Sequence, residues 1–266
     1  DAGDAGSYQC IITAGCGSAT SNSAALTLKT VTSISQHPTS TSVCTGGTAQ
    51  FTVTGAEHIP RSGGAVLAMN HIGYMDFTYA GLAARPSKRL VRFMAKAEVF
   101  KPKVSGFLLR GMKHIAVERG QGAQAYADAL TAVRKGEIVG VFPEETISRS
   151  FEIKELKAGA ARMAAESGAP LIPLVLWGSQ RVWTKGVKRR LGRTNTPIHI
   201  VVGEPIHVAP DADILAVTED LRTRMIAMLH GIQAAYPPMP EGLERFQPAR
   251  LGGQAPTMAE AKEYEQ

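Results

Sequence analysis

The chain has 266 residues, of which 44% are hydrophobic and 20% charged, and its formal net charge is +6. This composition excludes wholesale disorder and allows one large domain or two small ones. Its apolar runs fall short of the roughly 18–20 residues that span a bilayer, so no transmembrane segment is expected. Residues 1–56 carry a net charge of −1, which leaves +7 for the rest. A basic body favours anionic partners such as phosphates, coenzyme A, acidic lipids or nucleic acids.

Residues 1–52 are rich in Ser, Thr, Gly and Ala and contain short alternating runs, which predict β-strands. Tyr8 stands two residues before Cys10, as in the tyrosine corner of an immunoglobulin fold. The segment therefore resembles the end of one bacterial immunoglobulin-like module and the beginning of another. Neither part contains the seven strands of a complete sandwich. The sequence leaves open whether this junction is natural.

All three cysteines, Cys10, Cys16 and Cys44, lie in this partial immunoglobulin-like β segment. Two interpretations stay open. Cys16 and Cys44 form a disulfide in an oxidising compartment while Cys10 stays a buried thiol, or all three are reduced. The remainder of the chain contains no cysteine, which fits a cytosolic enzyme equally well.

Between residues 53 and 240, apolar runs typical of strands alternate with helical patterns. The predicted strands are 63–69, 90–95, 113–117, 138–142, 171–177 and 198–202, and the predicted helices are 76–84, 104–112, 123–135, 156–167 and 214–235. This alternation predicts an α/β fold with a central, mostly parallel sheet flanked by helices. Residues 241–266 are polar and contain Pro and Gly, so we expect a C-terminal tail that lies on the surface or is disordered.

Polar side chains follow three of the predicted strands: His71, Arg119 and Glu144. In open α/β sheets, ligands bind beyond the carboxyl ends of the strands. His71 and Asp76 would face different sides of a continuous helix, but a turn at Gly73 lets the carboxylate fold back onto the imidazole. The carboxylate would then hold the ring so that its other nitrogen takes a proton from a substrate hydroxyl. On spacing alone, a packed His beside a helix-capping Asp is an equal alternative.

Four motifs, in order, resemble those of the glycerol-3-phosphate and 1-acylglycerol-3-phosphate (lysophosphatidic acid) acyltransferases over roughly residues 53–235. The first, Asn-His-four residues-Asp, is matched by Asn70, His71 and Asp76, and the second by Arg119 after an apolar strand. The third is matched by Phe-Pro-Glu-Glu-Thr-Ile-Ser at 142–148, a form that most resembles actinobacterial members. The fourth, an apolar strand with a central Pro, is matched by residues 171–174.

This resemblance implies a 1-acylglycerol-3-phosphate O-acyltransferase that uses acyl-CoA or acyl carrier protein to acylate lysophosphatidic acid, giving phosphatidic acid. It implies that His71 is the general base, Asp76 its partner and Arg119 a ligand of the acceptor phosphate, for which Arg offers a fork of donors. Transfer of a thioester to an alcohol needs only a base and positioning, so neither a metal nor a cofactor besides the acyl donor is expected.

The third motif departs from the family at two positions. Glu145 replaces a small residue, and its carboxylate would repel a phosphate unless it points away; Ile147 replaces a common Arg. Arg149 is a candidate to restore the lost positive charge. The complete set of predicted substrate-binding residues is Arg119, Glu144, Thr146, Arg149 and Lys157. For Glu144 and Thr146 the alternative is that they only shape the turn, and for Lys157 that it is a solvated helix lysine.

The basic stretch 181–193, with Trp177 and Trp183 nearby, suits contact with an anionic membrane surface; a solvated basic loop is the alternative. No nucleic-acid-binding motif is present, so nucleic acid is not an expected partner. We therefore expect a peripheral protein on the cytoplasmic face of the cell membrane, of unpredicted oligomeric state. Two alternatives remain: an acyltransferase for another lysophospholipid or a glycolipid, and a cell-surface immunoglobulin-like binding protein with an inactive acyltransferase domain.

Overall fold

A computed structural model describes residues 6–8, 11–14, 17–20, 24–26, 51–118, 120, 122–190, 192 and 194–264. The chain divides into two compact units, Asp1–Ser42 and Val43–Gln266. In the first unit, β1 (Gly6–Tyr8) pairs with β4 (Ala24–Leu26) and β2 (Ile11–Ala14) with β3 (Gly17–Thr20), both antiparallel. The assignment of this unit to an immunoglobulin-like module stays a prediction, and all three cysteines lie outside the described residues.

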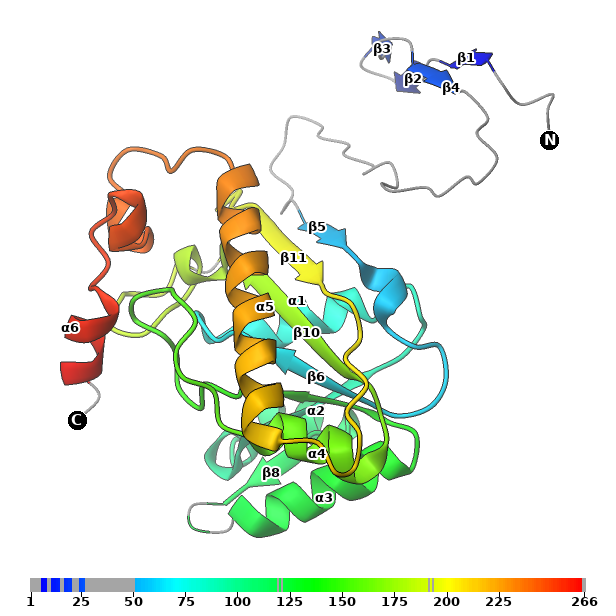
Figure 1. Cartoon of the computed structure of the whole chain (residues 1–266). Helices are drawn as coiled ribbons and strands as arrows, with labels where there is room; N and C mark the ends of the chain where they lie inside the picture. The colour runs from blue at the N-terminus through cyan, green and yellow to red at the C-terminus, as the bar shows by residue number, and fades with distance from the viewer. Residues whose placement is uncertain are drawn as a thin grey trace. The chain divides into compact units, whose positions relative to one another are not determined.

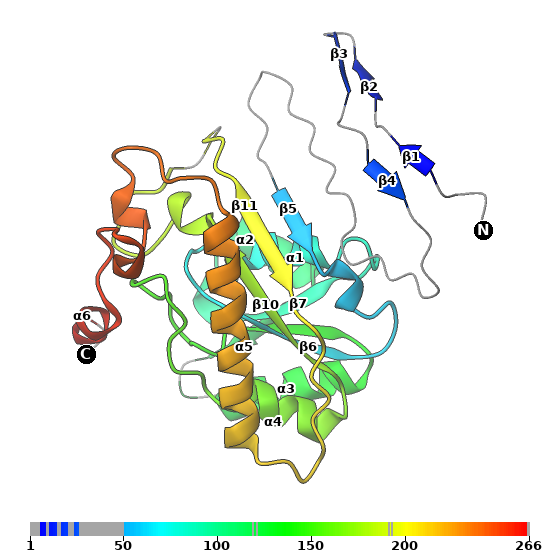
Figure 2. The same ribbon diagram turned by 45° about the horizontal axis from the view of Figure 1, so that its top comes forward.

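The second unit is built on one sheet of seven strands in the order β5-β11-β10-β6-β9-β7-β8 (Figures 1 and 2). Its strands are β5 (Phe51–Thr54), β6 (Ala65–Met69), β7 (Val91–Lys96), β8 (Ile115–Val117), β9 (Ile138–Val141), β10 (Leu171–Trp177) and β11 (Ile198–Val202). All neighbouring strands are parallel except the antiparallel pair β10–β11. The predicted α/β class with a mostly parallel sheet is confirmed.

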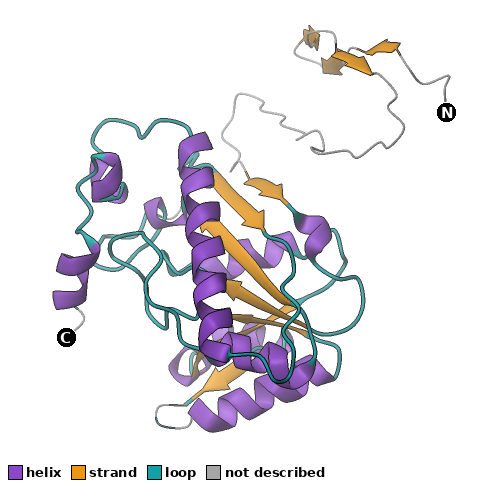
Figure 3. Ribbon diagram, in the orientation of Figure 1, coloured by secondary structure: helices purple, strands orange, loops and turns teal. Residues whose placement is uncertain are grey.

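Helices cover both faces of this sheet, as the alternation of purple helices and orange strands in Figure 3 shows. The helices are α1 (Asp76–Ala83), α2 (Lys103–Gly111), α3 (Gly122–Arg134), α4 (Gly159–Ser167), α5 (Ile214–Ala235) and α6 (Met258–Glu263), with short 3₁₀ turns between them. Helix α5 lies across one face of the sheet and α1 on the other (Figures 1 and 2).

The two central strands have the composition that burial on both faces requires. Every residue of β6 and β10 is buried, and both are continuous apolar runs. Pro173 interrupts β10 in sequence, but the ladder with β11 begins only at Leu174, so its missing N–H falls beyond the last paired residue. Nearer the edge of the sheet, the residues of β11 are alternately buried and half-buried, because only one face of this strand is fully covered.

Three expectations about the elements are corrected. The helix expected from residue 156 begins at Gly159, because the Lys157 backbone N–H bonds instead to the Pro143 carbonyl at 2.9 Å. The alternating residues at the end of the N-terminal segment form β5 (Phe51–Thr54) of the main sheet, and this strand straddles the predicted boundary after residue 52. The C-terminal tail is not disordered between residues 241 and 264: it forms two 3₁₀ turns and α6, and Phe246 is 1% exposed.

Candidate active site

The candidate site lies at the carboxyl edge of the parallel strands. Strands β6 and β9 run side by side, with Ala68 opposite Val141, and each leads directly into a polar loop. His71 follows β6 and Glu144 follows β9, so the first and third motifs meet where the strands end. The loop after β8 leads to Arg119, which lies outside the described residues, so its role as a phosphate ligand stays a prediction.

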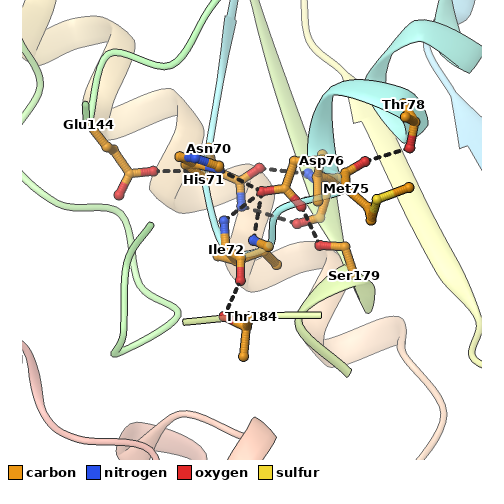
Figure 4. A network of polar contacts seen from close by, with 11 residues as sticks. Asn70, His71, Ile72, Met75, Asp76, Thr78, Glu144, Ser179 and Thr184 are labelled. Carbon is orange, nitrogen blue, oxygen red and sulfur yellow. Dashed lines mark hydrogen bonds and ion pairs between the residues drawn. The ribbon is translucent and has the colours of Figure 1, made fainter. Parts of the chain in front are cut away.

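His71 and Asp76 are in direct contact, as the turn at Gly73 predicts (Figure 4). The His71 Nδ1 atom lies 3.0 Å from Asp76 Oδ2, and the same oxygen accepts the backbone N–H groups of Ile72 at 2.7 Å and Gly73 at 2.8 Å. Ser179 Oγ donates to the other oxygen at 2.6 Å. Because two backbone N–H groups and a hydroxyl donate to it, the fully buried Asp76 side chain is an acceptor, so we assign the proton of the His71 ring to Nδ1.

Further contacts stabilise the tight turn of the loop that contains His71. A Cβ atom on Gly73 would lie 2.9 Å from the Trp183 carbonyl oxygen, so the turn has room only for glycine. Thr184 Oγ1 donates to the Ile72 carbonyl at 2.7 Å, and the Ser148 N–H donates to the His71 carbonyl at 2.7 Å. The backbone of the His71 loop is therefore tied both to the third motif and to the segment after β10.

The imidazole of His71 stacks on the Phe142 ring, with centroids 4.2 Å apart and an interplanar angle of 27°. The side chain is 19% exposed, and no hydrogen bond from the described part of the chain reaches Nε2. One ring nitrogen is thus committed to Asp76, while the other retains its lone pair for an incoming group. The geometry is that of an oriented general base.

Glu144 bridges two loops through its side chain. Its Oε1 accepts the His71 backbone N–H at 2.9 Å and its Oε2 the Lys154 backbone N–H at 3.0 Å. Burial raises the pKa of this carboxyl to about 7, although both N–H groups act to lower it. Glu144 therefore fixes the backbone at His71, which is the turn-shaping alternative considered for it.

The exposed turn after Glu144 carries one of the other predicted ligands, Thr146, and lies beside a second, Lys157. Glu145 has a left-handed backbone (φ 62°), and its carboxylate lies 3.8 Å from Lys157 Nζ. Lys154 Nζ donates to Thr146 Oγ1 at 2.6 Å. Glu144, Lys154 and Lys157 line a cavity of about 200 Å³ together with Met258, Ala261 and Lys262 of the α6 segment. The structure thus brings Glu144, Thr146 and Lys157 together, and it adds Lys154.

The remaining predicted contacts are Arg149 and the basic stretch 181–193. The Arg149 guanidinium lies 5.6 Å from the Tyr264 ring centroid, and a Cβ on Gly186 would lie 3.2 Å from its Nη1. Within the stretch expected to contact lipid, Arg181 is buried and donates to Tyr236 Oη at 3.0 Å, and Trp177 is buried in the sheet. The prediction that these two side chains form part of an interfacial surface is wrong, because both belong to the interior.

Sequence reasoning missed Ser179, Thr184 and Lys154 as parts of the site. Ser179 and Thr184 lie more than 100 positions from the residues they contact, so the spacing of the motif residues does not reveal the pairing. The available signal was the Gly178-Ser179 pair, because it directly follows the Pro-containing strand of the same sheet.

Among the described residues, no three His, Cys, Asp or Glu side chains gather as a metal site would require. In that same part of the chain no helix combines the length and the apolar character that crossing a bilayer demands.

Comparison with known proteins identifies the family. Residues 50–177 match the family model described as Acyltransferase. The 1-acyl-sn-glycerol-3-phosphate acyltransferase of Bacillus subtilis is 30% identical over 179 residues, which cover 64% of this chain and 83% of that protein. The enzyme of the same name from Borreliella burgdorferi is 28% identical over 173 residues, 63% of each chain.

A solved structure supports the same fold. The 1-acyl-sn-glycerophosphate acyltransferase of Thermotoga maritima superimposes with a TM-score of 0.59 at 19% identity, over 71% of this chain and 75% of that one. The residues that match the family model reach from β5 through β10, the strand that precedes Ser179. The chain therefore belongs to the 1-acyl-sn-glycerol-3-phosphate acyltransferase family.

Proposed function

We propose that the protein transfers a fatty acyl group from acyl-CoA or acyl carrier protein to the free hydroxyl of 1-acylglycerol-3-phosphate, giving phosphatidic acid. The observation that carries this proposal is the His71–Asp76 pair at 3.0 Å, with Nε2 left for substrate. The names of the relatives support the acceptor class. No cofactor besides the acyl donor is invoked.

In the proposed reaction, His71 Nε2 takes the proton of the acceptor hydroxyl while its oxygen attacks the thioester carbonyl carbon. Asp76 stabilises the imidazolium that forms, because its carboxylate already accepts the Nδ1–H. The tetrahedral intermediate collapses, the C–S bond breaks, and the leaving thiolate takes the proton back from Nε2. The ester forms, the free thiol departs and His71 returns to its starting state.

The acceptor phosphate needs a cationic site near this base. We assign it to Arg119 at the end of the β8 loop and to Lys157 beside the turn of the third motif, with Thr146 as a neutral donor. Arg149 lies farther along the same loop, against Tyr264, and we assign it to that packing contact and not to the phosphate. Glu144 is a positioning residue, since both of its oxygens are occupied by backbone N–H groups.

Replacing His71 by Ala tests the proposal. Turnover of acyl-CoA with lysophosphatidate, measured by thiol release and by mass spectrometry of the lipid product, should fall by about 10²- to 10⁴-fold. His230→Ala is the matched control, because His230 lies on α5 and is 42% exposed. Unchanged turnover in the His71 variant would exclude the proposed base. A panel of lysophospholipid and glycolipid acceptors, offered to the wild type with both donor types, identifies the preferred substrates.

A second candidate function keeps the family fold but not its acceptor. The carboxylate of Glu145 lies 3.8 Å from Nζ of Lys157, which lines the cavity, and would oppose a phosphate bound to that lysine. This observation favours an acceptor of lower charge, such as a glycolipid. Higher turnover on a neutral acceptor than on lysophosphatidate would support it. The proposed location, peripheral at the cytoplasmic face of the membrane, follows from a lipid acceptor in either case.

A further inference from the structure

The connection between β7 and β8, residues 97–113, lies at the same sheet edge as His71. It contains the 3₁₀ turn η3 (Ala97–Phe100) and α2. Strand β8 pairs only with the last three residues of β7, from Met94 opposite Ile115 to Lys96 opposite Val117. The chain therefore leaves the sheet and re-enters it near the carboxyl ends of the parallel strands, which is where β6 leads into His71.

Helix α2 is buried at Gly106 and presents charged and apolar side chains to solvent at other described positions. Gly106 is buried against η3, where a Cβ would lie only 2.0 Å from the Phe100 carbonyl oxygen. Lys103, Phe107 and Arg110 follow at helical spacing and all three are exposed, and the Arg110 guanidinium also donates to the Phe100 carbonyl at 3.1 Å. Phe107 is 74% exposed, an unusual state for so large an apolar side chain on a packed helix.

The same connection concentrates positive charge. Residues 96–113 carry five basic side chains, all exposed, against the single carboxylate of Glu98, a net charge of +4. The basic residues are Lys96, Lys101, Lys103, Arg110 and Lys113. Two more exposed apolar side chains, Val99 and Met112, lie among them at 44% and 43% exposure. Large apolar groups set among cations are the pattern of surfaces that enter the headgroup region of an anionic bilayer.

We propose that residues 97–113 form the surface by which the protein docks on an anionic phospholipid bilayer, with Phe107 and Met112 entering the interface and the cations contacting lipid phosphates. The choice of occupant rests on the proposed function, because an acyl-chain-bearing acceptor must pass from a bilayer to His71. Arg181 and Trp177, which are buried, are not part of this surface. An acidic acyl carrier protein is the competing occupant. Its binding would depend on the basic side chains but not on Phe107 and Met112.

Vesicle sedimentation of the full-length protein tests the docking surface directly. Binding to phosphatidylcholine vesicles should rise when phosphatidylglycerol is added. Lys101→Gln with Lys103→Gln should weaken it by about 25-fold, at roughly fivefold for each charge near an anionic surface. Lys88→Gln with Lys135→Gln removes the same charge from exposed positions before β7 and β9, at the opposite sheet edge, and should leave binding unchanged.

The contribution of the apolar side chains to vesicle binding can be tested with a matched control variant. Phe107→Ser should weaken vesicle binding by about tenfold or more, whereas Leu215→Ser, in the first turn of α5 and also 74% exposed, should not. Equal losses in test and control variants, or no loss in either, would overturn the proposal. So would intact vesicle binding combined with weakened use of acyl carrier protein donors, which would assign the surface to that protein.

Kinetics separate this inference from the proposed function. With lysophosphatidate presented in vesicles, Phe107→Ser should raise the apparent KM, while a short-chain acceptor below its critical micelle concentration should be turned over as by the wild type. A loss on both acceptors would contradict docking. If no acceptor is turned over by the wild type, the proposed function fails, but the vesicle measurement still decides whether residues 97–113 bind a bilayer.

Discussion

The side chain of Glu144 and the backbone of His71 are joined by a hydrogen bond of 2.9 Å, in which the His71 N–H donates to Oε1. The Glu144 carboxyl is buried and its pKa is raised. It thus holds the candidate base through the backbone of His71 and not through a hydrogen bond to the imidazole ring. Its second oxygen binds the Lys154 N–H, so one side chain couples the loops after β6 and β9.

This coupling predicts a pH dependence of stability. The folded-state pKa of Glu144 is about 7, above the ordinary value of 4.5, so the native state holds its proton longer than the unfolded state. The wild type should lose up to about 3 kcal/mol relative to Glu144→Gln as pH rises from about 4.5 to 7, and no more above that. Urea unfolding of both proteins at several pH values measures the difference. A difference that stays constant across this range would contradict the prediction.

Asp76→Asn should separate charge from geometry. An Asn can keep its oxygen toward His71, Ile72 and Gly73 and turn its NH₂ group toward Ser179 Oγ, which can accept. We expect acyl transfer to fall by about 10²- to 10⁴-fold while the free energy of unfolding changes by only about 1 kcal/mol. Ser179→Ala is the comparison, since it keeps the charge and removes one donor; it should reduce the rate far less. A larger loss in the Ser179 variant would show that geometry matters more than charge.

Glu145→Gly should relieve strain in the turn of the third motif. The left-handed conformation costs an ordinary L-residue about 1 kcal/mol, and glycine avoids that cost. Glu145→Ala removes the same carboxylate but keeps a Cβ, so the glycine variant should be more stable than the alanine variant by up to about 1 kcal/mol. Thermal unfolding of both measures this. Under the proposed function, both variants should also lower the KM for lysophosphatidate; an increase would place the carboxylate in contact with the acceptor.

Phe246→Ala should destabilise the whole second unit. Phe246 is 1% exposed, and its carbonyl accepts a hydrogen bond from Gln180 in the turn after β10. Removing its ring should cost about 3–5 kcal/mol. Leu251→Ala, in the same C-terminal segment but 38% exposed, should cost less than about 1 kcal/mol. Similar small losses for both variants would mean that the segment contributes little to folding.

The elements that sequence predicted well are those with strong local signals. Helix α5 begins after Asp213, whose side chain accepts the Leu215 and Ala216 N–H groups, and ends before Pro237, so both limits are encoded by single residues. The strand at 171–177 is a continuous apolar run, and its limits are also as predicted.

The features that the sequence did not predict are those without a strong local signal. The alternation in Phe51–Thr54 predicts a strand but carries no information about which sheet it joins. Phe246 is an isolated apolar residue in a polar stretch, and only its packing reveals its burial. The His71–Asp76 contact was within reach because the two residues are five apart, whereas Ser179 joins them only through the fold.

The order of the sheet has a consequence for the way the chain is made. Strand β5 is the first of the seven strands to leave the ribosome, and its partner among the described residues is β11, with Thr54 opposite Val201, roughly 150 residues later. At translation rates of about 5–20 residues per second, β5 waits for seconds without its hydrogen-bonding neighbour. During that interval the short strand is exposed to mispairing, and a chaperone acting on this protein should bind there.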